Sequence, residues 1–127
     1  MARRFLQIAV VYLLAGALLG LTMGIRQNFS LTPVHAHTLL LGWASLALAG
    51  LIYHLYPAAG ATRLAKIHFW LHNLALPVFM IGLAFYLSGK PAFMPAVAGG
   101  ATLVVLGIVF FTINVLRNVR SSPSGAQ

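Results

Sequence analysis

The 127-residue chain contains no aspartate, no glutamate and no cysteine. Without carboxylates, a single chain cannot form a paired-carboxylate catalytic site or an acidic proton relay. Without thiols, it cannot form disulfides, iron–sulfur clusters, thiolate metal sites or a covalent c-type haem attachment. The side chains that remain for metal or redox chemistry are chiefly the five histidines.

Charged residues are scarce and apolar residues abundant. Hydrophobic residues make up 61% of the chain, and its mean hydropathy is +0.94, which is too apolar for a soluble domain of this size. Four apolar stretches each reach the roughly 20 residues that a helix needs to cross a bilayer. They are residues 5–25, 34–56, 67–88 and 93–116. Because a helix satisfies its own backbone in lipid, the sequence predicts an all-α integral membrane four-helix bundle. It forms a single domain, residues 1–120, followed by a disordered tail at 121–127.

The basic residues lie at the ends of the apolar stretches and do not form a patch, although the formal net charge is +8. If the N-terminus is cytoplasmic, Arg26 and Lys90 lie outside and the other six basic residues lie inside. The positive-inside rule then predicts an N-in, C-in topology, and we expect the protein in a bacterial inner membrane. The bilayer is the expected partner, and nucleic acid is not.

All five histidines fall in the second and third apolar stretches, where an ionisable residue is costly and indicates function. His35 and His37 lie in the first turn of the second helix, at the outer face. His54 lies about 25 Å deeper at 1.5 Å per residue, and the third helix begins inside, which places His68 and His72 near it. The sequence thus predicts an outer and an inner site, with His37 and His72 about 20 Å apart in depth.

Several ligands suit these sites, because neutral imidazole binds haem iron, copper and zinc. Two histidines that face each other from different helices would suit six-coordinate haem b. Arg26 outside, and Arg63 or Lys66 inside, are then candidates to bind the haem propionates. Copper or zinc could instead be held by the inner histidines, His54, His68 and His72. A third interpretation is a non-catalytic accessory or assembly subunit of a respiratory complex, whose histidines only pack and form hydrogen bonds.

The segments "PVHAHTLLLGW" and "YHLYP", with "HFWLHN" further on, resemble the first helices of subunit I of the haem–copper oxidase superfamily. The similarity is closest to cbb3-type oxidases and nitric oxide reductases. In that family a histidine near the outer end of helix 2 ligates the low-spin haem, which implies this role for His35 or His37. The resemblance covers only the first helices of a longer fold, so the copper and high-spin haem ligands are missing. It therefore implies a small b-type cytochrome for electron transfer or haem and redox sensing, not an enzyme that reduces oxygen or nitric oxide.

His35 and His37 lie about 200° apart around a helix, so they cannot both face one pocket. An outer haem in a single chain would therefore lack a second ligand. This predicts a homo-oligomer that shares ligands or packs on the stripe formed by Gly16, Gly20 and Gly24. A respiratory-chain electron donor or acceptor is a further expected partner.

Overall fold

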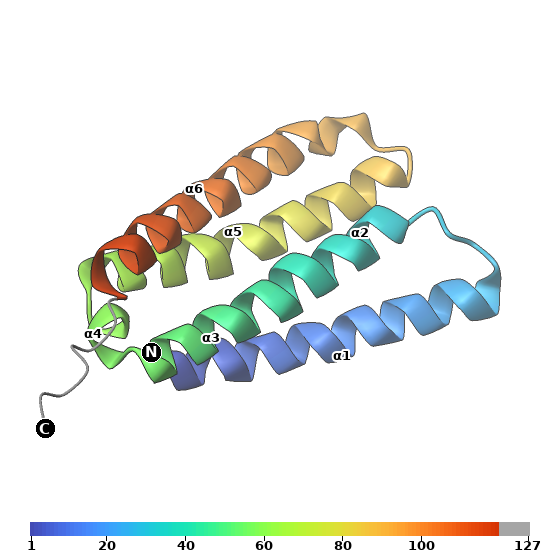
Figure 1. The fold of residues 1–127 in the computed structure, drawn as a ribbon. Helices are drawn as coiled ribbons and strands as arrows, with labels where there is room; N and C mark the ends of the chain where they lie inside the picture. Colours follow the sequence, from blue (N-terminus) through green and yellow to red (C-terminus); the bar gives the residue numbers. More distant parts are fainter. Residues whose placement is uncertain (120–127) are drawn as a thin grey trace, which may run out of the picture.

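Four long antiparallel helical segments make up the computed structural model, which describes residues 1–119 (Figure 1). The predicted tail at 121–127 lies outside the described residues. In chain order the elements are α1 (Ala2–Arg26), α2 (Thr32–His37), the π-helix η1 (Thr38–Ala44), α3 (Ser45–Leu55), α4 (Pro57–Gly60), α5 (Arg63–Leu87), the 3₁₀ turn η2 (Pro91–Phe93) and α6 (Met94–Asn118).

Four segments are long and apolar enough to cross a membrane: Ala2–Arg26, Thr32–Leu55, Arg63–Leu87 and Pro91–Asn118. The predicted all-α bundle is confirmed, and the chain has the makeup of a multi-pass membrane protein. The second span is one continuous rod in which α2, η1 and α3 follow without a break. Its π-helical middle section was not predicted from the sequence.

Local sequence signals set the ends of these helices. Pro33 lies in the first turn of α2, where its missing N–H costs no helical hydrogen bond. The third span begins at Arg63, four residues before the predicted start at 67, because the Thr62 hydroxyl caps it by accepting from the Ala65 N–H. Gln27 ends α1 in the left-handed conformation, with φ of 50°.

The bundle consists of two helical hairpins, α1 with the α2–η1–α3 rod and α5 with α6 (Figure 1). Glycines let the helices approach closely in both. A Cβ on Gly42 would lie 2.5 Å from Cγ of Tyr12, and one on Gly100 would lie 2.7 Å from the backbone nitrogen of Phe79. Small residues thus serve contacts within the chain.

The glycine stripe of α1 is largely used in the same way. A Cβ on Gly16 would meet Leu39, and one on Gly20 would lie 2.7 Å from the His35 ring. Gly24 alone has no atom within 4 Å among the described residues. The stripe therefore packs mainly on the second span of its own chain, and the prediction that it joins two copies does not fit this arrangement.

Two clusters of buried side chains hold the hairpins together. One, near the chain termini, is centred on Phe5, whose ring contacts Phe69 at 5.1 Å and Tyr53 at 5.5 Å between centroids. The other, toward the opposite end, includes Val34, Leu76, Phe79, Met80 and Val104. Between the two hairpins, the His72 side chain bonds the Leu41 carbonyl and the His37 ring contacts Phe79.

The charge distribution predicts that the loop between α1 and α2 is outside and the loop before α5 is inside. Because the chain has no cysteine, a single introduced thiol reports its own side of the membrane. Ser30→Cys and Ala61→Cys place a thiol at exposed loop positions. We expect a membrane-impermeant maleimide to label Ser30→Cys in intact cells and Ala61→Cys only after lysis. The reverse pattern would contradict the N-in topology.

Close contact between α5 and α6 predicts that two neighbouring glycines differ in tolerance. Gly100→Leu forces a side chain against the α5 backbone, whereas Gly99 has no neighbour within 4 Å among residues 1–119. We expect Gly100→Leu to lower the free energy of unfolding by about 1–3 kcal/mol and Gly99→Leu to change it by less than about 0.5 kcal/mol. Unfolding in detergent, followed by circular dichroism, measures both. Equal effects would show that this contact does not stabilise the hairpin.

Candidate functional site

His35 fastens the second span to the first. Its Nδ1 lies 2.9 Å from the carbonyl oxygen of Gly16, and its ring lies against Gly20, where no Cβ intervenes. A carbonyl oxygen only accepts, so Nδ1 carries the proton and donates it. In the neutral ring, Nε2 then keeps its lone pair.

His37 has the same tautomer but faces another neighbour. Its Nδ1 donates to the Pro33 carbonyl, 2.7 Å away in its own helix, and its ring meets Phe79 edge-on at 5.3 Å. His35 thus faces α1 and His37 faces α5, as the helix geometry predicts. The ring of His37 is half-buried, and its Nε2 is left as an available lone pair. A ring N–H held by a backbone carbonyl is the arrangement typical of metal-ligating histidines.

His72 joins the two hairpins. Its side chain is 1% exposed, and its Nε2 donates to the Leu41 carbonyl oxygen at 2.9 Å. Because Nε2 carries the proton, Nδ1 is the acceptor in the neutral ring, and this buried atom has no partner among residues 1–119. Leu41 belongs to the π-helix η1, and such segments often mark functional sites.

A chain of polar groups connects His68 with the end of the bundle that carries α4 (Pro57–Gly60). The Tyr53 hydroxyl lies 3.3 Å from Nδ1 of His68, and the Asn114 amide donates to that hydroxyl at 3.4 Å and to the Ala59 carbonyl at 2.9 Å. The Thr62 hydroxyl donates to Oδ1 of Asn114 at 2.9 Å. Asn114 was missed in the sequence, where the only signal was an amide inside the apolar run "FFTINVL".

His54 does not join the other inner histidines. It is exposed and lines a hollow of about 360 Å³ at the N-terminal end of α1, together with Met1, Tyr53 and Pro57. Residues 1–119 include all five histidines, and no three potential metal ligands among them lie close enough to hold a metal ion. The structure pairs His68 with His72, whose ring centroids are 5.4 Å apart, but it does not assemble the predicted trio with His54.

The predicted depth difference between His37 and His72 was wrong. His37 contacts Phe79, and Phe79 lies seven residues from His72 along α5, which is about 10 Å and not about 20 Å. The early start of α5 explains much of the error. Four extra residues at its N-terminus place both inner histidines about 6 Å deeper in the bundle than predicted.

The two candidate cations lie at opposite ends of the bundle. Arg26 closes α1 at the His37 end and lines a small hollow of about 100 Å³ with Asn28 and Ser30. Arg63 opens α5 at the His54 end. Both are exposed, so each could bind an anionic group near the membrane surface.

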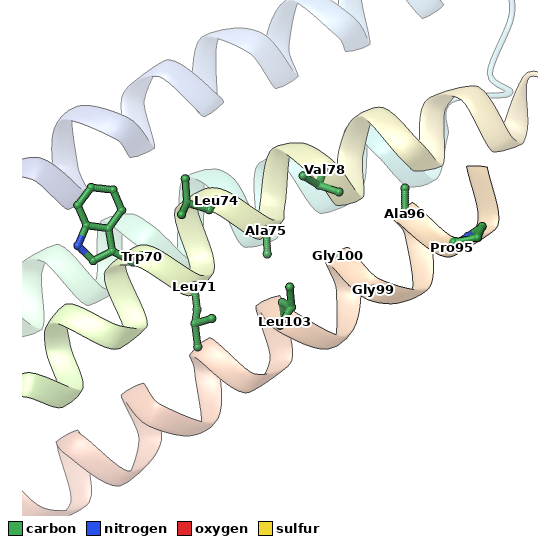
Figure 2. Close-up of a pocket in the computed structure, with 10 residues that line it drawn as sticks. All are labelled: Trp70, Leu71, Leu74, Ala75, Val78, Pro95, Ala96, Gly99, Gly100 and Leu103. Carbon is green, nitrogen blue, oxygen red and sulfur yellow. The ribbon is translucent and has the colours of Figure 1, made fainter. Parts of the chain in front are cut away.

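The hollows differ in size and polarity. One hollow of about 490 Å³ lies between α5 and α6, and Figure 2 shows its lining of Trp70, aliphatic side chains and glycines. It contains no titratable group and faces outward like the rest of the apolar surface. The hollow beside His68 and His72 is about 210 Å³. That is below the range of 300–1,000 Å³ typical of sites for drug-sized ligands, so a haem does not fit in the hollow beside His68 and His72.

Comparisons of this chain with family models, curated proteins and solved structures found no match. The resemblance to haem–copper oxidase subunit I therefore stays a prediction. What can be argued about function comes from the residues and their geometry.

The buried amide of Asn114 predicts a large loss of stability when it is removed. Asn114→Leu leaves the Tyr53 and Thr62 hydroxyls and the Ala59 carbonyl with fewer partners in a buried site. We expect the free energy of unfolding to fall by about 2–3 kcal/mol, measured by denaturant titration in detergent. Thr112→Ala is the control, because the exposed Thr112 hydroxyl only bonds its own helix. Comparable losses in both variants would contradict a stabilising role for the network.

Proposed function

We propose that the chain is a membrane-bound b-type haem protein for electron transfer or redox sensing, with His37 as an axial ligand. One observation carries this proposal. The Nδ1–H of His37 is held by the Pro33 carbonyl, which fixes the ring and leaves Nε2 free in a half-buried, apolar position. Haem b, when bound, supplies a one-electron redox couple.

His37 suits this role better than the other histidines. The His35 ring is enclosed against Gly16 and Gly20 of α1, where it acts as a helix-to-helix contact. The Nε2 atom of His72 already donates to Leu41, and the ring is buried. His54 is exposed at the opposite end of the bundle.

The second axial ligand is best supplied by the same histidine of a second copy. No other imidazole in the chain faces His37, since His35 points to α1 and His72 lies about 10 Å away along α5. A haem held between two copies would lie against their apolar outer faces, which include Leu40 and Val78. Arg26 lies at the same end and is the better candidate for a propionate than Arg63.

The alternatives have less support. A copper or zinc site of His54, His68 and His72 would need the trio that the structure does not assemble. If the chain were an accessory subunit without a cofactor, the Nε2 lone pair of His37, whose ring is fixed by the Pro33 carbonyl, would have no role. A bacterial inner-membrane location and a respiratory-chain redox partner belong to the same proposal, and they rest on the charge pattern and the resemblance.

Absorption spectra of the protein from haem-sufficient cells test the proposal. We expect a sharp Soret band and split α and β bands after dithionite reduction, with one haem per two chains. His37→Ala should remove the haem, because both copies lose their histidine and the iron then has neither axial ligand.

His54→Ala is the matched control, since it removes a histidine from the opposite end of the bundle. Its spectrum should equal that of the unchanged protein. A colourless preparation, or a normal spectrum in His37→Ala, would overturn the proposal. Metal analysis of a colourless preparation would then separate a copper or zinc protein from a subunit without cofactor.

A further inference from the structure

A second site lies beside the two buried histidines, His68 and His72, in the half of the bundle nearer Met1. Its hollow of about 210 Å³ is enclosed by three helices. The lining residues are Ser45, Leu48 and Ile52 from α3, His68 and His72 from α5, and Ile108 and Phe111 from α6. Leu48 is 58% exposed at its rim, so the hollow is reached from the lipid side.

One of the residues that line this hollow has a buried polar atom without a hydrogen-bond partner among residues 1–119. Nδ1 of His72 is an acceptor, because Nε2 uses the ring proton in its bond to Leu41. A buried acceptor without a donor costs about 1–3 kcal/mol. An occupant that offers an O–H or N–H group would remove this penalty.

His68 offers the complementary group. The Tyr53 hydroxyl accepts from Asn114, which leaves its own proton to be donated to Nδ1 of His68. Nε2 of His68 then carries the ring proton and can donate. The two imidazole rings are 5.4 Å apart and nearly perpendicular, so one small group can contact both. A hydroxyl, which donates and accepts at once, matches this pair.

The apolar residues that line the hollow, and its volume, indicate the size and polarity of the bound molecule. Leucine, isoleucine and phenylalanine surround the histidines, and an apolar cavity of about 150 Å³ is known to hold benzene. A hollow of about 210 Å³ therefore has room for a single substituted ring and not for a macrocycle. Because Leu48 at the rim of the hollow faces the lipid, a ring-containing molecule dissolved in the membrane can enter the hollow.

We propose that this hollow binds the head group of a membrane quinol, with a ring hydroxyl between His72 and His68. The hydroxyl donates to Nδ1 of His72 and accepts from Nε2–H of His68, while the isoprenoid tail leaves past Leu48 into the lipid. The site does not depend on the proposed haem, because its lining does not include His37. It can therefore be tested in protein prepared with or without haem.

Anaerobic titration calorimetry of the full chain in detergent tests this site, with ubiquinol-1 as the probe. The matched ligand is its 1,4-dimethyl ether, which keeps the ring and tail but has no hydroxyl proton. We expect the ether to bind at least tenfold more weakly. A tail-free ring, 2,3-dimethoxy-5-methylhydroquinone, should also bind more weakly. Equal binding of the tail-free ring would overturn the assignment to a membrane quinol.

Three variants test the location of the site, so that the test does not depend on the folding of any single variant. Leu48→Trp fills the hollow from its rim and should weaken ubiquinol-1 binding at least tenfold, while Leu51→Trp, on an exposed position outside the lining, should leave it within twofold. His72→Phe should weaken ubiquinol-1 but not its dimethyl ether. No binding of ubiquinol-1, equal affinity for the ether, or unchanged binding in Leu48→Trp would each overturn the proposal.

Discussion

The hydrogen bond from His72 to the Leu41 carbonyl is the polar contact on which the bundle depends. It joins the α5–α6 hairpin to the α1–α3 hairpin in the middle of the apolar interior. Water is absent from the hydrocarbon core, so a buried imidazole must find its partners within the protein. The chain supplies no carboxylate, and a backbone carbonyl takes that place.

Because each buried imidazole must find a carbonyl within the protein, His35, His37 and His72 differ in which ring nitrogen donates. His35 and His37 donate from Nδ1 and keep Nε2 free, whereas His72 donates from Nε2 and keeps Nδ1 free. The first arrangement is the one that a ligand to haem iron requires. The second leaves a buried acceptor beside a small apolar hollow, where it suits a neutral hydroxyl. The same residue type can thus serve two different sites because each ring meets a different carbonyl.

The sequence predicted the architecture well and the sites less well. Apolar length alone predicts four spans, and turn spacing on a helix predicts that His35 and His37 face different neighbours. The depth of His72, estimated by counting residues along the predicted helix, was wrong because the Thr62 cap starts α5 four residues before the predicted start at 67. The π-helix and the Asn114 network also escaped prediction, since both depend on contacts between helices distant in sequence.

The ring tautomers of His35, His37 and His72 test the central claim most directly. Solid-state ¹⁵N NMR of protein labelled at histidine, with each signal assigned by a single substitution, distinguishes Nδ1–H from Nε2–H imidazole. The account predicts Nδ1–H for His35 and His37 and Nε2–H for His72, in cofactor-free protein at neutral pH. An Nε2–H tautomer at His37, or Nδ1–H at His72, would contradict it, because the carbonyl contacts that separate the two sites would then not exist.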